Sequence, residues 1–170
     1  MSPIALDDLY QQVILDHARQ QHGRGLREAA PGQPTAENRQ LNPLCGDEVT
    51  LRVALASEVE PGTGPVVADV SWTGEGCSIS QAATSVLHDL VVGQPAGSAR
   101  DLVAAYRQMI RSRGRAEPDE DLLGDAVAFV GVGRHANRVK CAMLGWTAFE
   151  AALDLAALEG TDERVMSEGQ

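Results

Sequence analysis

The residues of this chain best suited to chemistry are its three cysteines, each of which lies in a separate short motif. They are Cys45, Cys77 and Cys141, and no further cysteine is present. An odd number of cysteines argues against a complete set of disulfides. Three thiols and the nearby carboxylate of Asp47 make a four-ligand set of the kind that zinc binds tetrahedrally. This set of ligands does not decide between a structural metal and a reactive one.

The position of each cysteine relative to the predicted elements indicates how the three could meet. Cys45 precedes a predicted strand, Cys77 begins a helix after the next strand, and Cys141 falls in the predicted first turn of the last helix. An antiparallel hairpin returns the chain to its starting point, so Cys45 and Cys77 are expected to lie close together. A helix N-terminus favours the thiolate, so we expect both Cys77 and Cys141 to be activated in this way.

Small and charged neighbours support the same interpretation. We expect Gly46 to let the residues on either side of it turn towards one centre, and Gly74 and Gly76 to allow tight backbone around the second cysteine. The only lysine of the chain, Lys140, directly precedes the third cysteine. An ammonium beside a thiol favours the thiolate.

Each motif also has a simpler explanation when it is taken alone. A buried cysteine on a helical stripe, such as Cys141, is commonly a small hydrophobic residue. Residues 42–47 (Asn-Pro-Leu-Cys-Gly-Asp) are compatible with an ordinary turn. Residues 74–80 (Gly-Glu-Gly-Cys-Ser-Ile-Ser) could form an anion-binding loop, but no lysine follows as in a P-loop. The three motifs together, with no cysteine to spare, favour one shared site.

The four histidines are weaker candidates for ligands. His17 and His88 fall at helical positions, where a structural or surface role is the more common one, and His22 lies in a polar loop. His135 lies six positions before Cys141, so it could also reach a metal there. No Ser-His-Asp signature and no carboxylate pair for acid–base catalysis is apparent.

Composition and charge narrow the classes of partner. The chain has 170 residues, a net charge of −10 and a pI of about 4.7, and a basic cluster at 111–115 is followed at once by acidic residues. Phosphate contacts need clustered cations, so we expect no nucleic-acid partner. The sequence from residue 1 lacks the pattern of a secretory signal, and no apolar run approaches the ~18 residues of a membrane span. We therefore expect no membrane association and a cytoplasmic location, where thiols stay reduced.

The pattern of apolar residues predicts an α+β fold in one domain, residues 1–160, followed by a frayed tail, 161–170. Apolar residues at helical or alternating spacing predict the following elements: a helix over 6–17, an extended loop over 20–40, strands over 49–55 and 66–72 joined by a turn at 60–64, and helices over 82–91, 98–110, 122–130 and 138–158. Residues 131–133 (Gly-Val-Gly) are expected to end the fourth of these helices.

The three cysteine motifs, in this order, resemble those of the SufU-type members of the IscU/NifU-like family of iron–sulfur assembly proteins. The resemblance extends from Leu6 to Trp146. Two features indicate the SufU type. Cys77 and Cys141 are 64 positions apart, which suggests an insertion around residues 109–129, and Lys140 stands where IscU-type scaffolds carry a histidine.

The resemblance implies a fold, a site and a role. The fold would be a small antiparallel sheet of about three strands covered by helices. The site would be a zinc ion held by Cys45, Asp47, Cys77 and Cys141. The role would be that of a zinc-dependent sulfurtransferase: a SufS-type cysteine desulfurase supplies a ligand that replaces Cys45 on the zinc. The freed thiolate then takes persulfide sulfur and relays it to a SufBCD-type assembly complex.

Two residues beside the third cysteine are expected to support this site without binding the metal. Arg138 would steady a carboxylate or a thiolate, and Lys140 would act through its charge.

Two other functions remain open on the sequence. The same residues could hold iron or a nascent iron–sulfur cluster, as a scaffold does, although Lys140 in place of the histidine weakens that case. The residues could also form a purely structural zinc module for protein association. The Leu-Pro-Pro-Val-Lys segment that binds a chaperone in IscU-type scaffolds is absent, since residues 135–140 contain no proline.

Overall fold

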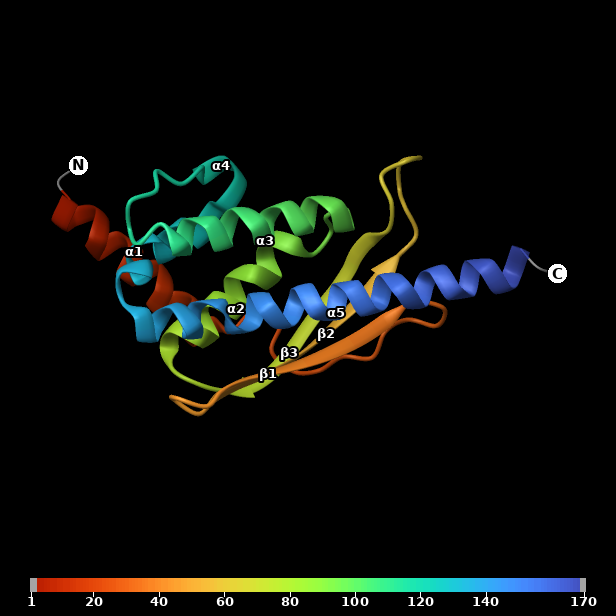
Figure 1. The fold of residues 1–170 in the computed structure, drawn as a ribbon, viewed down its shortest axis with the longest axis horizontal. Coiled ribbons are helices and arrows are strands. Elements are labelled where there is room, and N and C mark those ends of the chain that lie inside the picture. Colours follow the sequence, from red (N-terminus) through yellow and green to blue (C-terminus); the bar gives the residue numbers. More distant parts are fainter. Residues whose placement is uncertain (1–2, 169–170) are drawn as a thin grey trace.

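The computed structural model describes residues 3–168 and contains one three-stranded sheet with helices gathered along it (Figure 1). The elements in chain order are α1 (Pro3–Gln20), β1 (Thr35–Asn42), β2 (Asp47–Ala56), β3 (Val66–Glu75), α2 (Ser78–Val91), α3 (Ala96–Arg111), α4 (Glu120–Leu123), the 3-10 helix η1 (Gly124–Arg134) and α5 (Ala136–Glu168). The α+β class and the three antiparallel strands expected from the resemblance are confirmed.

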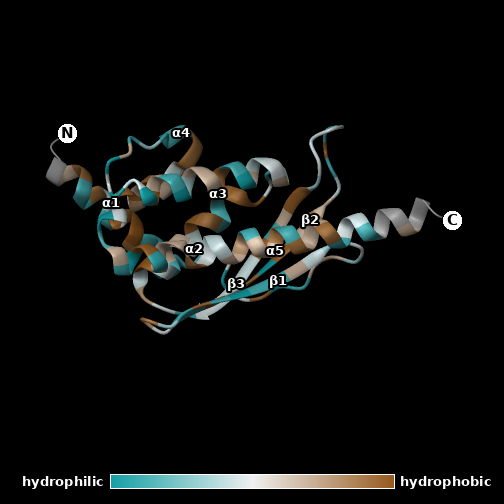
Figure 2. Cartoon of the chain, in the orientation of Figure 1, coloured by the Kyte–Doolittle hydropathy of each residue, from teal (hydrophilic) through white to brown (hydrophobic). Residues whose placement is uncertain are grey.

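The sheet has the order β1-β2-β3 and is antiparallel throughout. Strand β2 is central, and its alternate residues Val49, Leu51, Val53 and Leu55 are buried, as the period-two pattern predicted. Helix α5 lies along β1 and β2 and continues past the end of the sheet (Figure 1). Hydrophobic segments lie where helices and sheet face one another, and hydrophilic ones lie on the outside (Figure 2).

Strand β1 was not predicted: residues 20–40 were expected to form an extended loop, but Thr35–Asn42 form a strand. Its sequence, Thr-Ala-Glu-Asn-Arg-Gln-Leu-Asn, has no hydrophobic alternation. The strand forms because it pairs with β2 from Thr35↔Ala54 to Asn42↔Asp47 and packs against α5. An edge strand with polar residues on its open face carries little signal in its own sequence.

The prediction of one helix over 122–130 is also wrong, because two shorter helical elements cover this segment. The single turn α4 ends at Leu123, and a 3-10 helix then runs through Gly131 and Gly133 to Arg134, so the glycines do not end it. A Cβ on Gly133 would lie 2.3 Å from the carbonyl oxygen of Ile110. This close approach to α3 explains the need for glycine there.

Helix α5 forms the centre of the core. It contributes fully buried residues that include Trp146, Phe149 and Leu153, and Trp146 stacks on Tyr106 of α3 with ring centroids 3.8 Å apart. By length and composition alone its residues Ala136–Asp162 could cross a membrane, but 56% of the apolar window is buried within the fold, as in a core helix. The helix continues to Glu168. The domain boundary at residue 160 stays a prediction.

Candidate metal centre

The four residues predicted as metal ligands lie together at one end of the sheet. The sulfur atoms of Cys45 and Cys141 are 3.6 Å apart, and the sulfur of Cys77 is 3.5 Å from Oδ2 of Asp47. The ligand atoms of Cys45, Asp47 and Cys141 all lie within 4.8 Å of one another. The chain thus brings its three cysteines, distant in sequence, to one carboxylate.

Strand pairing and a helix start determine this arrangement. Cys45 lies in the turn between β1 and β2, and Asp47 is the first residue of β2. The pairing Glu48↔Glu75 continues β2 alongside β3, which places Cys77 next to Asp47. Cys77 is the N-cap residue of α2, as its predicted place at a helix start required, and its backbone N–H donates to Oδ1 of Asp47 at 3.3 Å.

Two glycines act as the sequence predicted. Gly46 has φ +70°, a left-handed conformation that other residues adopt with strain, and it directs its two neighbours into the cluster. A Cβ on Gly76 would lie 2.3 Å from Oγ of Ser80 and 3.1 Å from Cγ of Asp47. The Ser80 hydroxyl and the Asp47 carboxylate together therefore occupy the space that a larger residue at position 76 would need.

The donor set suits zinc. Two sulfurs bound to one tetrahedral zinc at about 2.3 Å each are about 3.8 Å apart. The 3.6 Å separation of the Cys45 and Cys141 sulfurs is close to this value and far longer than a disulfide bond of about 2.05 Å. All three cysteines are free thiols. Three thiolates and one carboxylate are donors that zinc accepts in proteins.

The position of Cys141 in its helix differs from the predicted one, which was the first turn. Cys141 is the sixth residue of α5 and so lies in the second helical turn, where the N-terminal dipole is weaker. Its side chain is buried, and burial together with contacts to Asp47, Cys45 and Cys77 raises the pKa of the thiol. The expected activation by the helix N-terminus is therefore wrong for Cys141. The thiol donates to the carbonyl oxygen of Asn137 at 3.7 Å.

Asn42 contacts the candidate site, although the sequence predicted it only as part of a turn. Its side chain is buried, and Nδ2 donates to the sulfur of Cys45 at 2.8 Å. Its Oδ1 accepts the backbone N–H of Leu44, and its carbonyl oxygen accepts that of Gly46 at 2.8 Å. An asparagine three positions before a cysteine in an Asn-Pro turn is the signal that could have identified it.

The thiols open into a surface pocket of about 640 Å³. Its lining includes Cys45, Cys77, Cys141, His135, Arg138 and Tyr10. Arg138 thus shares a pocket with the three thiols, and its role in steadying a carboxylate or a thiolate stays a prediction. Lys140 instead lines a separate hollow with Asn42 and Pro43.

The histidines divide into two groups. His135 lines the pocket of the thiols, and whether it ever binds a metal stays a prediction. His17 is buried, as expected of a structural residue, and its two ring nitrogens contact Ser85 and Asp125. Ser85 is fully buried, so this Ser-His-Asp contact is not open to a substrate. His22 and His88 both contact Asp89.

Comparison with known proteins identifies relatives along most of the chain. Residues 9–142 match the model of the NifU-like N-terminal domain. The chain is 33% identical to the zinc-dependent sulfurtransferase SufU of Bacillus subtilis, over 85% of this chain and 89% of that protein. It is 31% identical to the iron–sulfur cluster assembly scaffold protein IscU of Streptococcus pyogenes, over 89% of this chain and 87% of that protein.

A solved structure has the same fold. The crystal structure of a SufU protein from Fervidobacterium islandicum, proposed as an iron–sulfur cluster assembly scaffold for the SUF system, is 30% identical to this chain. It superposes with a TM-score of 0.64 over 84% of this chain and 94% of that one.

Proposed function

This chain belongs to the family of NifU-like N-terminal domains, as a SufU-type member, and on that premise we propose that it accepts persulfide sulfur on Cys45. Iron–sulfur cluster assembly is the process it serves, in keeping with its SufU and IscU relatives. The donor in this proposal is a SufS-type cysteine desulfurase, and the acceptor of the relayed sulfur is a SufBCD-type complex.

The observation that carries the proposal is the difference between Cys45 and the other two thiols. Cys141 is buried on a helix, and Cys77 caps another helix. Cys45 is exposed, lies on a turn beside a left-handed glycine, and opens into the pocket. It is therefore the thiol that can leave the cluster with the least change in the rest of the fold.

The sulfur transfer involves no net oxidation or reduction. The Cys45 thiolate attacks the outer sulfur of a persulfide on the desulfurase, and a new S–S bond forms at Cys45. The S–S bond within the donor persulfide breaks, and the donor cysteine leaves as a thiolate. The proton on the transferred sulfur stays with it, so no oxidant or reductant is needed. The N–H of Asn42 favours the attacking form, because a charge-assisted hydrogen bond is stronger to a thiolate than to a thiol.

Zinc is the resident metal of this proposal, held by Cys45, Asp47, Cys77 and Cys141. When bound, it would keep the thiols deprotonated at neutral pH. The chain's own residues supply the rest: Gly76 leaves room for the Asp47 carboxylate, and the N–H of Cys77 orients it.

Exposed apolar residues beside Cys45 support docking of a protein donor rather than a small molecule. Leu44 is 73% exposed and Leu41 is 53% exposed, and both lie within four positions of Cys45. Arg138 adds a cation at the rim of the pocket. A desulfurase that covered this region would bury these side chains and exclude water from the transferred sulfur.

A scaffold for a nascent iron–sulfur cluster is the second candidate, because the Streptococcus and Fervidobacterium relatives are named as scaffolds. Three thiolates and a carboxylate can hold iron. The position of Lys140 in a separate hollow favours sulfur relay, because this position adds no nitrogen ligand to the thiol pocket.

The test is sulfur transfer from a SufS-type desulfurase to the zinc-loaded chain, read by intact mass as the addition of one sulfur atom. Cys45→Ala should abolish the addition. Cys77→Ala removes a thiol from the same cluster but leaves the acceptor, so it should weaken zinc binding and keep residual transfer. Equal addition to the wild type and the Cys45 variant would disprove the proposal, because another thiol would then be the acceptor. No addition to the zinc-loaded wild type would leave a structural zinc module. A stable, transferable cluster after anaerobic reconstitution, with no sulfur addition, would favour the scaffold.

A further inference from the structure

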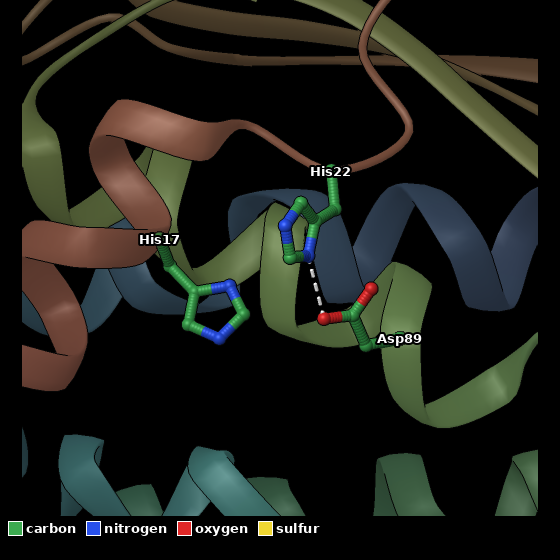
Figure 3. Close-up of side chains that lie close together, drawn as sticks. All are labelled: His17, His22 and Asp89. Carbon is green, nitrogen blue, oxygen red and sulfur yellow. Dashed lines mark hydrogen bonds and ion pairs between the residues drawn. The ribbon is translucent and has the colours of Figure 1, made fainter.

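A second group of side chains of the types that bind metals lies at the opposite end of α2 from the thiols. His17 is in the last turn of α1, His22 is in the loop that follows, and Asp89 is in the last turn of α2. One ligand atom from each lies within 4.8 Å of those from the other two. Figure 3 shows the three side chains directed towards one another from these separate segments.

The contacts of His17 prepare one ring nitrogen for a cation. Its Nε2 is 2.9 Å from Oδ2 of Asp125, and its Nδ1 is 2.8 Å from Oγ of Ser85. When Nε2–H donates to the carboxylate, Nδ1 keeps its lone pair, which now accepts the Ser85 hydroxyl. A cation on Nδ1 would take the place of that hydroxyl hydrogen, and Ser85 Oγ would keep its bond from the His22 N–H. A histidine that binds a metal nearly always donates its other N–H to a carboxylate or carbonyl, and Asp125 already fills that place.

His22 and Asp89 supply the other two donors. Nδ1 of His22 lies 2.6 Å from Oδ2 of Asp89, and Nδ1 of His88 lies 3.0 Å from Oδ1. Partial burial opposes ionisation of Asp89, but the hydrogen bonds from His88 and His22 outweigh it and lower the pKa of this carboxyl. A divalent cation would replace the proton that His22 and Asp89 now share, while His88 would continue to hold the second oxygen.

The backbone around this group favours a positive charge. Two helices, α1 and α2, end beside it, and the C-terminal ends of helices carry a partial negative charge. Two imidazoles and one carboxylate suit a borderline cation such as Zn²⁺ or Co²⁺, whereas Ca²⁺ and Mg²⁺ prefer oxygen ligands alone. The ligand set leaves a coordination position for water.

The group is separate from the cysteine cluster. Cys77 caps the start of α2 and Asp89 lies twelve positions later, which corresponds to about 18 Å along the helix. No ligand is therefore shared between the two sites.

We propose that His17, His22 and Asp89 form a second binding site, for a borderline divalent cation of the zinc class. An ion held there would join the end of α1 to the end of α2. Because α1 also lines the thiol pocket through Tyr10, the ion would help to fix the wall of that pocket.

The test is titration of the reduced, metal-free full chain, without an affinity tag, with Co²⁺ alone. Cobalt bound by thiolates gives a sulfur-to-metal charge-transfer band, and cobalt bound by imidazole and carboxylate gives only ligand-field bands. We expect two equivalents to bind, the second without added charge-transfer intensity. His22→Ala and Asp89→Asn should each weaken the second equivalent at least tenfold and leave the charge-transfer band unchanged.

His135→Ala is the matched control, since it removes a histidine elsewhere and should retain the second equivalent. Both test residues are partly exposed, so the variants should fold; His17 is buried and is left intact for that reason. Binding of one equivalent by the wild type would overturn the proposal. So would two equivalents of unchanged affinity in both variants, or loss of the second equivalent in the His135 control alone.

Discussion

The side-chain amide of Asn42 lies 2.8 Å from the sulfur of Cys45 and donates a hydrogen bond to it. The same residue holds the intervening turn through the backbone of Leu44 and Gly46. One buried asparagine thus orients the thiol and shapes the turn that carries it.

This relationship predicts the effect of Asn42→Ala. The sulfur loses its donor and the turn loses the hydrogen bond from the Leu44 N–H, whereas the backbone bond from Gly46 remains. Zinc affinity should therefore fall about tenfold, as for other residues that orient metal ligands. Competition with a chromophoric chelator measures this change. Asn38→Ala, the same substitution on the same strand but away from the cluster, should leave affinity unchanged; equal losses in both variants would contradict the assignment.

Gly76→Ala should damage the site through sterics alone. The new Cβ would lie 2.3 Å from Ser80 Oγ and 3.1 Å from Asp47 Cγ, so the carboxylate must move. We expect zinc affinity to fall at least tenfold and stability to fall by about 1–3 kcal/mol, the usual cost of overpacking. Gly97→Ala is the control: apart from its chain neighbours and the backbone of its own helix, no atom of the described residues lies within 4 Å of the added Cβ. Alanine should stabilise α3 there by about 0.5–1 kcal/mol. Competition with a chelator measures the zinc affinity, and denaturant unfolding measures the free energy of unfolding.

Metal removal should reveal an order of thiol reactivity. In the zinc-free chain at pH 7, iodoacetamide should modify Cys45 and Cys77 well before Cys141, since the first two are exposed and the third is buried. Burial and its neighbours also raise the pKa of Cys141, so its thiolate fraction stays low and its alkylation should accelerate only in alkaline solution. Peptide mass mapping over a time course gives the order. Zinc should protect all three thiols, and early modification of Cys141 at neutral pH would refute this description.

Asp69 should give a pH-dependent contribution to stability. The hydrogen bond from Arg27 lowers the pKa of Asp69 below its ordinary 3.8, so the folded state favours the ionised carboxylate. The contribution is therefore fully present above that value and is lost as the pH falls through the lowered pKa. Both side chains are partly exposed, so we expect Asp69→Asn to cost on the order of 1 kcal/mol or less at pH 7.

Urea unfolding at pH 7 and near pH 2 provides the measurement for this pair. The difference between the wild type and Asp69→Asn should disappear at the lower pH. Asp101→Asn, on the exposed side of α3, is the matched control and should leave the stability at pH 7 nearly unchanged. A difference that persists in acid would mean that packing, rather than the ion pair, accounts for the loss.

The elements with strong periodicity could be predicted from the sequence. Val49 to Leu55 alternate along β2 and are buried, and the amphipathic α2 and α3 lie where their spacing placed them. The convergence of Cys45, Asp47 and Cys77 followed from the same hairpin. These features depend on local pattern, which the sequence carries directly.

Features that depend on tertiary contacts could not be predicted. Strand β1 is polar and exists because β2 and α5 complete it. The 3-10 helix η1 forms where buried residues such as Phe129 pack under a close contact between Gly133 and α3. The grouping of His17 with Asp125 joins residues 108 positions apart, and no local spacing encodes it.

The position of Cys45 on the turn between β1 and β2 affects how fast its sulfur can move. Strand pairing resumes at Asn42↔Asp47, so only the four residues between them need to move for the sulfur to change partners. Short surface loops rearrange in nanoseconds to microseconds, whereas the opening of a domain takes microseconds to milliseconds. Motion of this turn would then not limit delivery, whose rate would follow the encounter with the protein donor and the exchange of ligands on the zinc.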